Sequence, residues 1–183
     1  MTLSHADNHD RDKLTRWHGD LLQCTGNDFP VIGVFVVSEL DTVGHDIFRA
    51  FRSSFEKRNA GFEHVVIFGQ HGVSETARRL LTTFGLPMDA TPALALIMGQ
   101  DSPMAYTIAL PAGGEEDSGQ EEDDQPWQQV LAEIEVASDM DATLLSLATI
   151  PDAVGHPLET TPLSKLIVAL LKSPKHPPAC SGR

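Results

Sequence analysis

The sequence contains little cysteine and no long apolar run. Its only two cysteines, Cys24 and Cys180, lie far apart and form no C-x-x-C pair. A disulfide framework is therefore not expected. No window holds the roughly 18 apolar residues that a membrane helix requires. The first ten residues also lack the basic start and the apolar core of a signal peptide, so we expect a cytoplasmic protein.

Positive charge is scarce as well. Lys and Arg number 13 against 26 Asp and Glu, which gives a formal net charge of -13 at pH 7. We expect such a chain to bind neither nucleic acid nor an anionic membrane, because phosphate groups are bound by positive surfaces. The charge permits a basic protein or peptide as the partner, and it also keeps the chain soluble.

No motif in the sequence predicts a metal or a cofactor. A structural zinc site needs four ligands at short spacings, and a phosphate site needs a glycine-rich loop. His5 and His9 have the i, i+4 spacing that holds a metal on a helix. No apolar residue anchors their segment, so we predict a frayed terminus there instead. Other candidate ligands show no diagnostic spacing: His45, Asp46, His64 and His71.

Hydrophobic periodicity predicts alternating strands and helices. Continuous apolar runs are typical of buried strands, and apolar residues at helical intervals are typical of helices packed on a core. The predicted strands are 31–37, 64–68, 93–98 and 104–110, and the predicted helices are 11–24, 45–58, 74–84 and one that begins at Pro126. The order predicts an α/β fold, in which helices flank a central mixed sheet and the last two strands form a hairpin.

The chain is too short for two ordinary domains, so we predict one domain with extensions. The predicted parts are a flexible N-terminus (1–10), the domain (11–137), a C-terminal extension with a helix near 162–172 (138–172) and a disordered tail (173–183). Within the domain, residues 113–125 are strongly acidic and carry no apolar anchor. They are predicted to form a mobile loop.

The predicted order resembles the thioredoxin fold over roughly residues 12–137. The buried strand 31–37 leads into a long helix at the position of that family's redox helix. The helix ending in Phe84-Gly85-Leu86 resembles the family's aromatic-glycine-aliphatic ending. Thr91-Pro92, directly before an apolar strand, resembles the family's cis-proline, although the spacing from Gly85 is about two residues longer. The resemblance implies a cis bond at Pro92 and a Thr91 backbone that pairs with a peptide or glutathione; an ordinary trans proline starting a strand is the alternative.

The chemistry of that family is not expected here. Its C-x-x-C lies between the first central strand and the redox helix, and residues 38–45 contain no cysteine. Thiol–disulfide exchange requires a thiolate, so we predict a redox-inactive protein. Ser38, Asp41 and His45 are the residue types of a nucleophile, an orienting acid and a base. Their close spacing on one loop favours loop and capping roles, with Asp41 or Thr42 as the helix cap.

Three functional hypotheses follow. The first is a protein-binding accessory factor or chaperone, whose binding residues would be Ser38, Asp41, Thr42, His45, Thr91 and Pro92. The alternative is a glutathione-binding or glutathione-transferase-like enzyme that uses Ser38, although the large helical domain of that family is missing from the sequence. The third is an assembly role for the C-terminal extension, whose helix by default packs on its own domain.

Overall fold

The computed structural model describes residues 4–23, 31–60, 64–99, 102–110, 126–139, 153–158 and 163–172. Helices and strands follow one another as predicted for an α/β chain, with one strand more than expected. They are α1 (His5–Gln23), β1 (Val31–Val36), α2 (Thr42–Lys57), β2 (Val65–Phe68), α3 (Glu75–Thr83), β3 (Ala93–Met98), β4 (Met104–Ala109), α4 (Pro126–Asp139), β5 (Val154–Pro157) and α5 (Leu163–Lys172).

The strands form one mixed sheet in the order β2-β1-β3-β4-β5. β1 and β2 run parallel, and every other neighbouring pair is antiparallel. The predicted hairpin of β3 and β4 is confirmed. All six residues of β1 are buried, as expected for a central strand covered on both faces.

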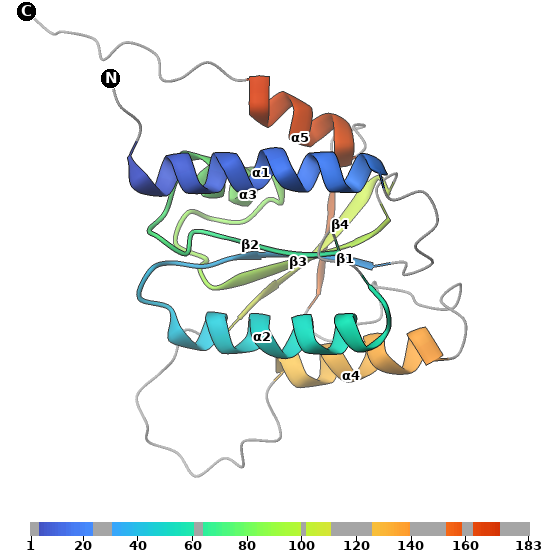
Figure 1. Ribbon diagram of the computed structural model, residues 1–183. Coiled ribbons are helices and arrows are strands. Elements are labelled where there is room, and N and C mark those ends of the chain that lie inside the picture. Colours follow the sequence, from blue (N-terminus) through green and yellow to red (C-terminus); the bar gives the residue numbers. More distant parts are fainter. Residues whose placement is uncertain are drawn as a thin grey trace, which may run out of the picture.

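Helices cover both faces of the sheet, which gives three layers (Figure 1). Alternate strand residues face opposite layers. Val34 of β1 packs in a cluster with α1, α3 and α5, and Phe35 packs in a second cluster with α2 and α4. The second cluster is rich in aromatic rings: Phe35 makes edge contacts with Phe48 and Phe51. The predicted mixed sheet flanked by helices is therefore confirmed.

The prediction of a flexible segment over residues 1–10 is wrong for residues 5–10. Helix α1 begins at His5. Ser4 caps it, because its hydroxyl oxygen accepts a hydrogen bond from the Asp7 N–H at 3.1 Å. The segment has no apolar anchor, but it has a polar one in Asp10, whose side chain is only 1% exposed.

The C-terminal extension belongs to the fold. Its strand β5 pairs with β4 at the edge of the sheet, and it was not predicted because Val-Gly-His-Pro has neither alternation nor β-propensity. Helix α5 buries Leu163 and Ile167 in the same cluster as α1. Arg11 of α1 also donates a hydrogen bond to the Leu171 carbonyl at 2.7 Å. The extension helix therefore packs on its own chain.

Three of the predicted features lie outside the described residues: the mobile acidic loop at 113–125, the tail at 173–183 and both cysteines. Within the ranges that the structure describes, no helix combines the length and the apolar character that are needed to cross a membrane.

Candidate functional site

Several loops meet at one end of the sheet. Val36, the last residue of β1, pairs with Phe68 at the end of parallel β2 and with Ala93 at the start of antiparallel β3. The segments 37–41, 69–74 and 84–92 therefore emerge at the same edge. Ligand sites of open α/β sheets lie characteristically outside the carboxyl ends of the strands. We call this edge the loop edge.

At the loop edge, Asp41 caps helix α2. Its Oδ1 accepts a hydrogen bond from the Gly44 N–H at 2.9 Å. Asp41 is one of the two residues that were predicted to cap this helix. Asp41 Oδ2 is shielded from solvent and has no hydrogen-bond partner among the described residues. The carboxylate is placed at the positive end of the helix, where a negative charge is stabilised.

Pro92 packs directly on the first turn of α2. The Thr91-Pro92 bond is cis, as the resemblance implied. A methyl group added to Gly44 would lie 2.9 Å from three atoms: Pro92 Cβ, Asp41 Oδ2 and Val37 Cγ1. Such separations are below any normal contact, so only glycine allows the proline ring this close to the helix. The structure thus brings Pro92 and Asp41 together, as predicted.

The other predicted site residues surround this contact without forming a catalytic group. Ser38 is half-buried, and its carbonyl accepts a hydrogen bond from the Asp41 N–H at 3.0 Å. Thr42 is exposed in the first turn, and His45 is half-buried one turn into the helix. In the described part of the chain, no hydrogen bond joins the side chains of Ser38, Asp41 and His45. The arrangement gives them loop and capping roles.

The rim of this region is apolar and acidic. Leu40, in the loop before α2, is 91% exposed, and Met88, in the loop before Thr91, is 47% exposed. Glu39 and Asp89 beside them are also exposed. Residues 38–45 and 86–91 contain no lysine or arginine. A single exposed leucine is common, but here apolar and acidic side chains occur together in the two segments that lead to Asp41 and to Pro92.

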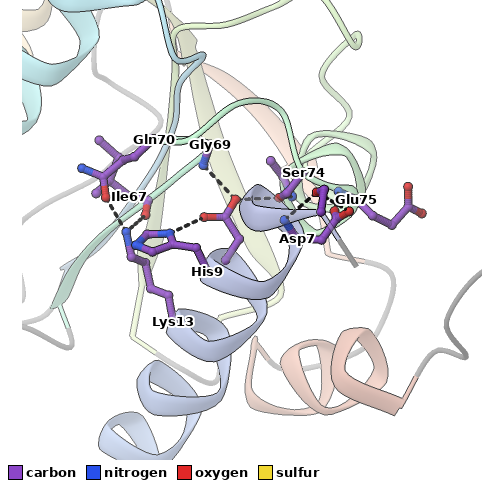
Figure 2. A network of polar contacts seen from close by, with 11 residues as sticks. Asp7, His9, Lys13, Ile67, Gly69, Gln70, Ser74 and Glu75 are labelled. Carbon is purple, nitrogen blue, oxygen red and sulfur yellow. Dashed lines mark hydrogen bonds and ion pairs between the residues drawn. The ribbon is translucent and has the colours of Figure 1, made fainter. Parts of the chain in front are cut away.

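A second polar group at the loop edge was not anticipated: a network around Asp10 of α1. Figure 2 draws this network and labels Gly69 and Ser74, which contact Asp10. Asp10 Oδ2 accepts hydrogen bonds from the Gly69 N–H at 2.9 Å and from the Ser74 hydroxyl at 2.6 Å. Ser74 Oγ in turn accepts from the Ala77 N–H at 2.9 Å and caps α3. One carboxylate therefore ties α1 to both ends of the loop between β2 and α3.

Asp7 makes a parallel connection one turn earlier. Its Oδ1 accepts a hydrogen bond from the Glu75 N–H at 2.8 Å, and its Oδ2 accepts from the Ser4 hydroxyl at 2.7 Å. Burial alone would raise the pKa of Asp7. The hydrogen bonds from Glu75 and Ser4 outweigh that effect and lower the pKa below its ordinary value. The ionised carboxylate is therefore the form that holds α1 against the start of α3.

Lys13 completes the network. Its Nζ donates to the Ile67 carbonyl at 2.8 Å and to the side-chain oxygen of Gln70. Burial lowers the pKa of Lys13 to about 8, an effect that the Asp10 carboxylate partly offsets and Arg16 increases. A lysine whose charge is disfavoured in the folded chain makes stability depend on pH.

We expect wild-type stability to rise with pH in the range from about 8 to 10.5. The folded pKa of Lys13 lies below its ordinary value of 10.5, so the unfolded chain binds more protons in this range. After allowance for solvent screening, the rise should be about 1–2 kcal/mol. Lys13→Met should remove it, and the matched variant Lys57→Met, at an exposed position in α2, should retain it. Urea unfolding at several pH values in this range measures the free energy of unfolding of each protein. The same dependence on pH in all three proteins would contradict the prediction.

Sequence reasoning missed the Asp10 network because its partners are 59 and 64 residues apart from it. The one local signal is Ser74, a good helix-capping residue at the start of the predicted helix 74–84, and its side chain does cap α3. As the side chains are placed, no three His, Cys, Asp or Glu residues of the described ranges are arranged to hold a metal ion.

Comparison with known proteins adds no relative: no family model matches the chain, and it matches neither a curated protein nor a solved structure.

Proposed function

We propose that this chain is a thioredoxin-like protein without redox activity, which binds an extended segment of a protein partner as an accessory factor or chaperone. One observation carries the proposal: Pro92 packs on Gly44 in the first turn of α2, and residues 38–45, which would supply the thiols, contain no cysteine. This contact is the one that the resemblance to the thioredoxin fold implies, and residues 38–45 carry no thiol for exchange chemistry. Both features favour recognition over redox chemistry.

The backbone of Thr91 supports a role in peptide binding. The Pro92 carbonyl is already bonded to the Leu110 N–H at 2.9 Å. Thr91, by contrast, makes no hydrogen bond to another described residue, and it is only half-buried. An extended peptide can pair with such a backbone, as in strand addition. Thr91 is therefore the proposed main-chain contact.

The rim indicates what kind of segment fits. Leu40 and Met88 offer apolar contact, and Glu39 and Asp89 add negative charge. No lysine or arginine in residues 38–45 or 86–91 neutralises these charges. The partner segment should therefore be basic and carry an apolar side chain. Its binding should weaken as salt is added, because exposed charges are screened.

Leu40→Ser tests the proposal. The purified chain is titrated with a library of extended peptides of either charge, and Kd is measured by fluorescence polarisation. We expect basic peptides with an apolar residue to bind. Removing the Leu40 contact should weaken binding by about tenfold or more, since burying a leucine is worth about 1.5–3 kcal/mol. Leu40 is 91% exposed, so the variant should fold normally.

Val136→Ser is the matched control. Val136 lies on α4, is 56% exposed and is not part of the loop edge. Its replacement removes a similar apolar surface and should leave Kd unchanged. The proposal fails if no peptide binds, or if both variants behave like the wild type.

A glutathione-binding enzyme remains the alternative, and Ser38 is the residue that favours it. Ser38 is half-buried in the loop between β1 and α2, where its hydroxyl could serve a bound thiol. Calorimetric titration with glutathione separates the two functions. If glutathione binds and Ser38→Ala weakens the binding, the enzyme hypothesis is favoured. If millimolar glutathione gives no heat of binding, the enzyme hypothesis is rejected.

A further inference from the structure

Three histidines that are far apart in the sequence lie together beside the first turns of α1. His5 and His9 are one helical turn apart, and His71 comes from the loop between β2 and α3. The ring centroids of His9 and His71 are 4.3 Å apart, and those of His5 and His71 are 5.0 Å apart. His5 and His71 are exposed, and His9 is half-buried. We call these residues the histidine cluster.

We propose that the histidine cluster binds one divalent transition-metal ion, such as Zn²⁺, for which imidazole is a preferred ligand. With metal–nitrogen distances of about 2.0–2.1 Å and ligand angles of about 90–109°, imidazole centroids lie about 4.5–5.2 Å apart. The observed separations of 4.3 and 5.0 Å are close to this range. Two of the three ring separations thus lie in or near the range expected for rings that share an ion.

Binding requires a change of ring orientation. The rings now pack tilted or edge to face, so their nitrogens do not point toward one common position. Accordingly, no ready-made set of metal ligands is found among the described residues. His5 and His71 are exposed, and exposed side chains change rotamer within nanoseconds. Turning two free imidazoles toward the third is therefore an easy step.

His9 is already oriented for the role. Its Nδ1 lies 3.3 Å from Asp10 Oδ1. Asp10 Oδ2 accepts two further hydrogen bonds, so the carboxylate acts as an acceptor and His9 Nδ1 as the donor. The lone pair then lies on Nε2, the other ring nitrogen. A carboxylate that fixes the tautomer of a ligating histidine is the usual outer-shell arrangement of metal sites.

The surrounding charge favours a cation. The carboxylates of Asp7 and Asp10 lie on the same turns of α1 as the cluster. Glu39 Oε2 lies 3.8 Å from where a side chain on Gly72 would begin. A further carboxylate therefore lies near the loop that carries His71. Lys13 and Arg78 oppose this field, because they interact with the carboxylates of Asp10 and Asp7. The metal proposal rests on the histidine cluster alone and is independent of peptide binding at Thr91.

Zinc titration of the metal-free full chain tests the site. Calorimetry should give one Zn²⁺ per chain with a Kd tighter than about 100 µM. His71→Ala should weaken it by at least about tenfold, as the loss of even an outer-shell partner does in metal sites. Zn²⁺ should raise the Tm of the wild type and not that of His71→Ala. Because His71 is exposed, the variant should fold.

His18→Ala is the matched control, since His18 lies on the same helix two turns beyond the cluster and should not affect Kd. The proposal is overturned if the wild type shows no saturable zinc binding. It is also overturned if His71→Ala binds as tightly as the wild type, which would leave only His5 and His9. Equal weakening by His18→Ala would likewise place the zinc elsewhere and overturn it.

Discussion

Gly69→Ala should destabilise the chain by about 3–5 kcal/mol, the largest effect that we expect from a single methyl group. Gly69 has a φ of +86°, and an added Cβ would lie 1.9 Å from the Val37 carbonyl oxygen. That oxygen belongs to the backbone and cannot rotate away. Either β1 and β2 separate at the loop edge, or the Gly69 N–H loses its bond to Asp10.

Urea unfolding followed by circular dichroism measures this loss. At about 2–4 °C per kcal/mol for a chain of this size, the Tm should fall by about 6–20 °C in a thermal melt. Gly99→Ala is the control, because Gly99 also has a positive φ, +68°, but no atom lies within 4 Å of the added Cβ. It should lose only about 1 kcal/mol, the backbone penalty by itself. Equal losses in the two variants would contradict the close packing of Gly69 on Val37.

Local patterns were sufficient to predict most of the secondary structure. β3 was predicted at its observed bounds because its six residues form a continuous apolar run. Five of them are buried. Helix α3 was predicted within one residue at each end, since Ser74 caps it and Gly85 follows it with a φ of +68°. These signals are encoded within a few residues of the element that they define, and no distant partner has to be known.

Features that depend on distant partners could not be predicted. β5 is a strand because β4 offers a free edge, not because its own four residues prefer that state. The start of α1 at His5 depends on bonds to Gly69 and Ser74, far along the chain. Helical spacing places Asp10, four residues before Leu14, on the apolar face of α1, and it places the exposed Asp12 on another face. Nothing local, however, identifies the distant partners of Asp10.

The candidate site divides in the same way. The contact between Pro92 and the loop before α2 was expected, because the resemblance to the thioredoxin fold implies it. The histidine cluster was not expected, although His5 and His9 have the i, i+4 spacing of metal ligands on a helix. Its third member, His71, lies beside α1 in a loop that is tied to Asp10. A metal site assembled from two segments is thus hidden until the tertiary structure brings them together.

Asp10→Ala should cost about 3–4 kcal/mol. The carboxylate is 1% exposed and accepts two hydrogen bonds, from the Gly69 N–H and the Ser74 hydroxyl. A hydrogen bond to a charged group contributes about 1.5–3 kcal/mol, and a buried donor left without a partner adds a further penalty. Helix α1 would lose its polar anchor while keeping Leu14 and Trp17 in the core. Its first turns should therefore fray before the rest.

Asp12→Ala is the matched control, because Asp12 lies on the same helix and is exposed; it should change stability by no more than about 0.5 kcal/mol. Asp10→Asn retains one acceptor and should fall between the two. Hydrogen exchange should show faster exchange of the first turns of α1 and of Gly69 in Asp10→Ala. If Asp10→Ala is as stable as Asp12→Ala, apolar packing alone holds α1 in place. Zinc titration of Asp10→Ala is a second test. Fraying of these turns would separate His5 and His9 from His71, so the Kd for zinc should rise as the stability falls.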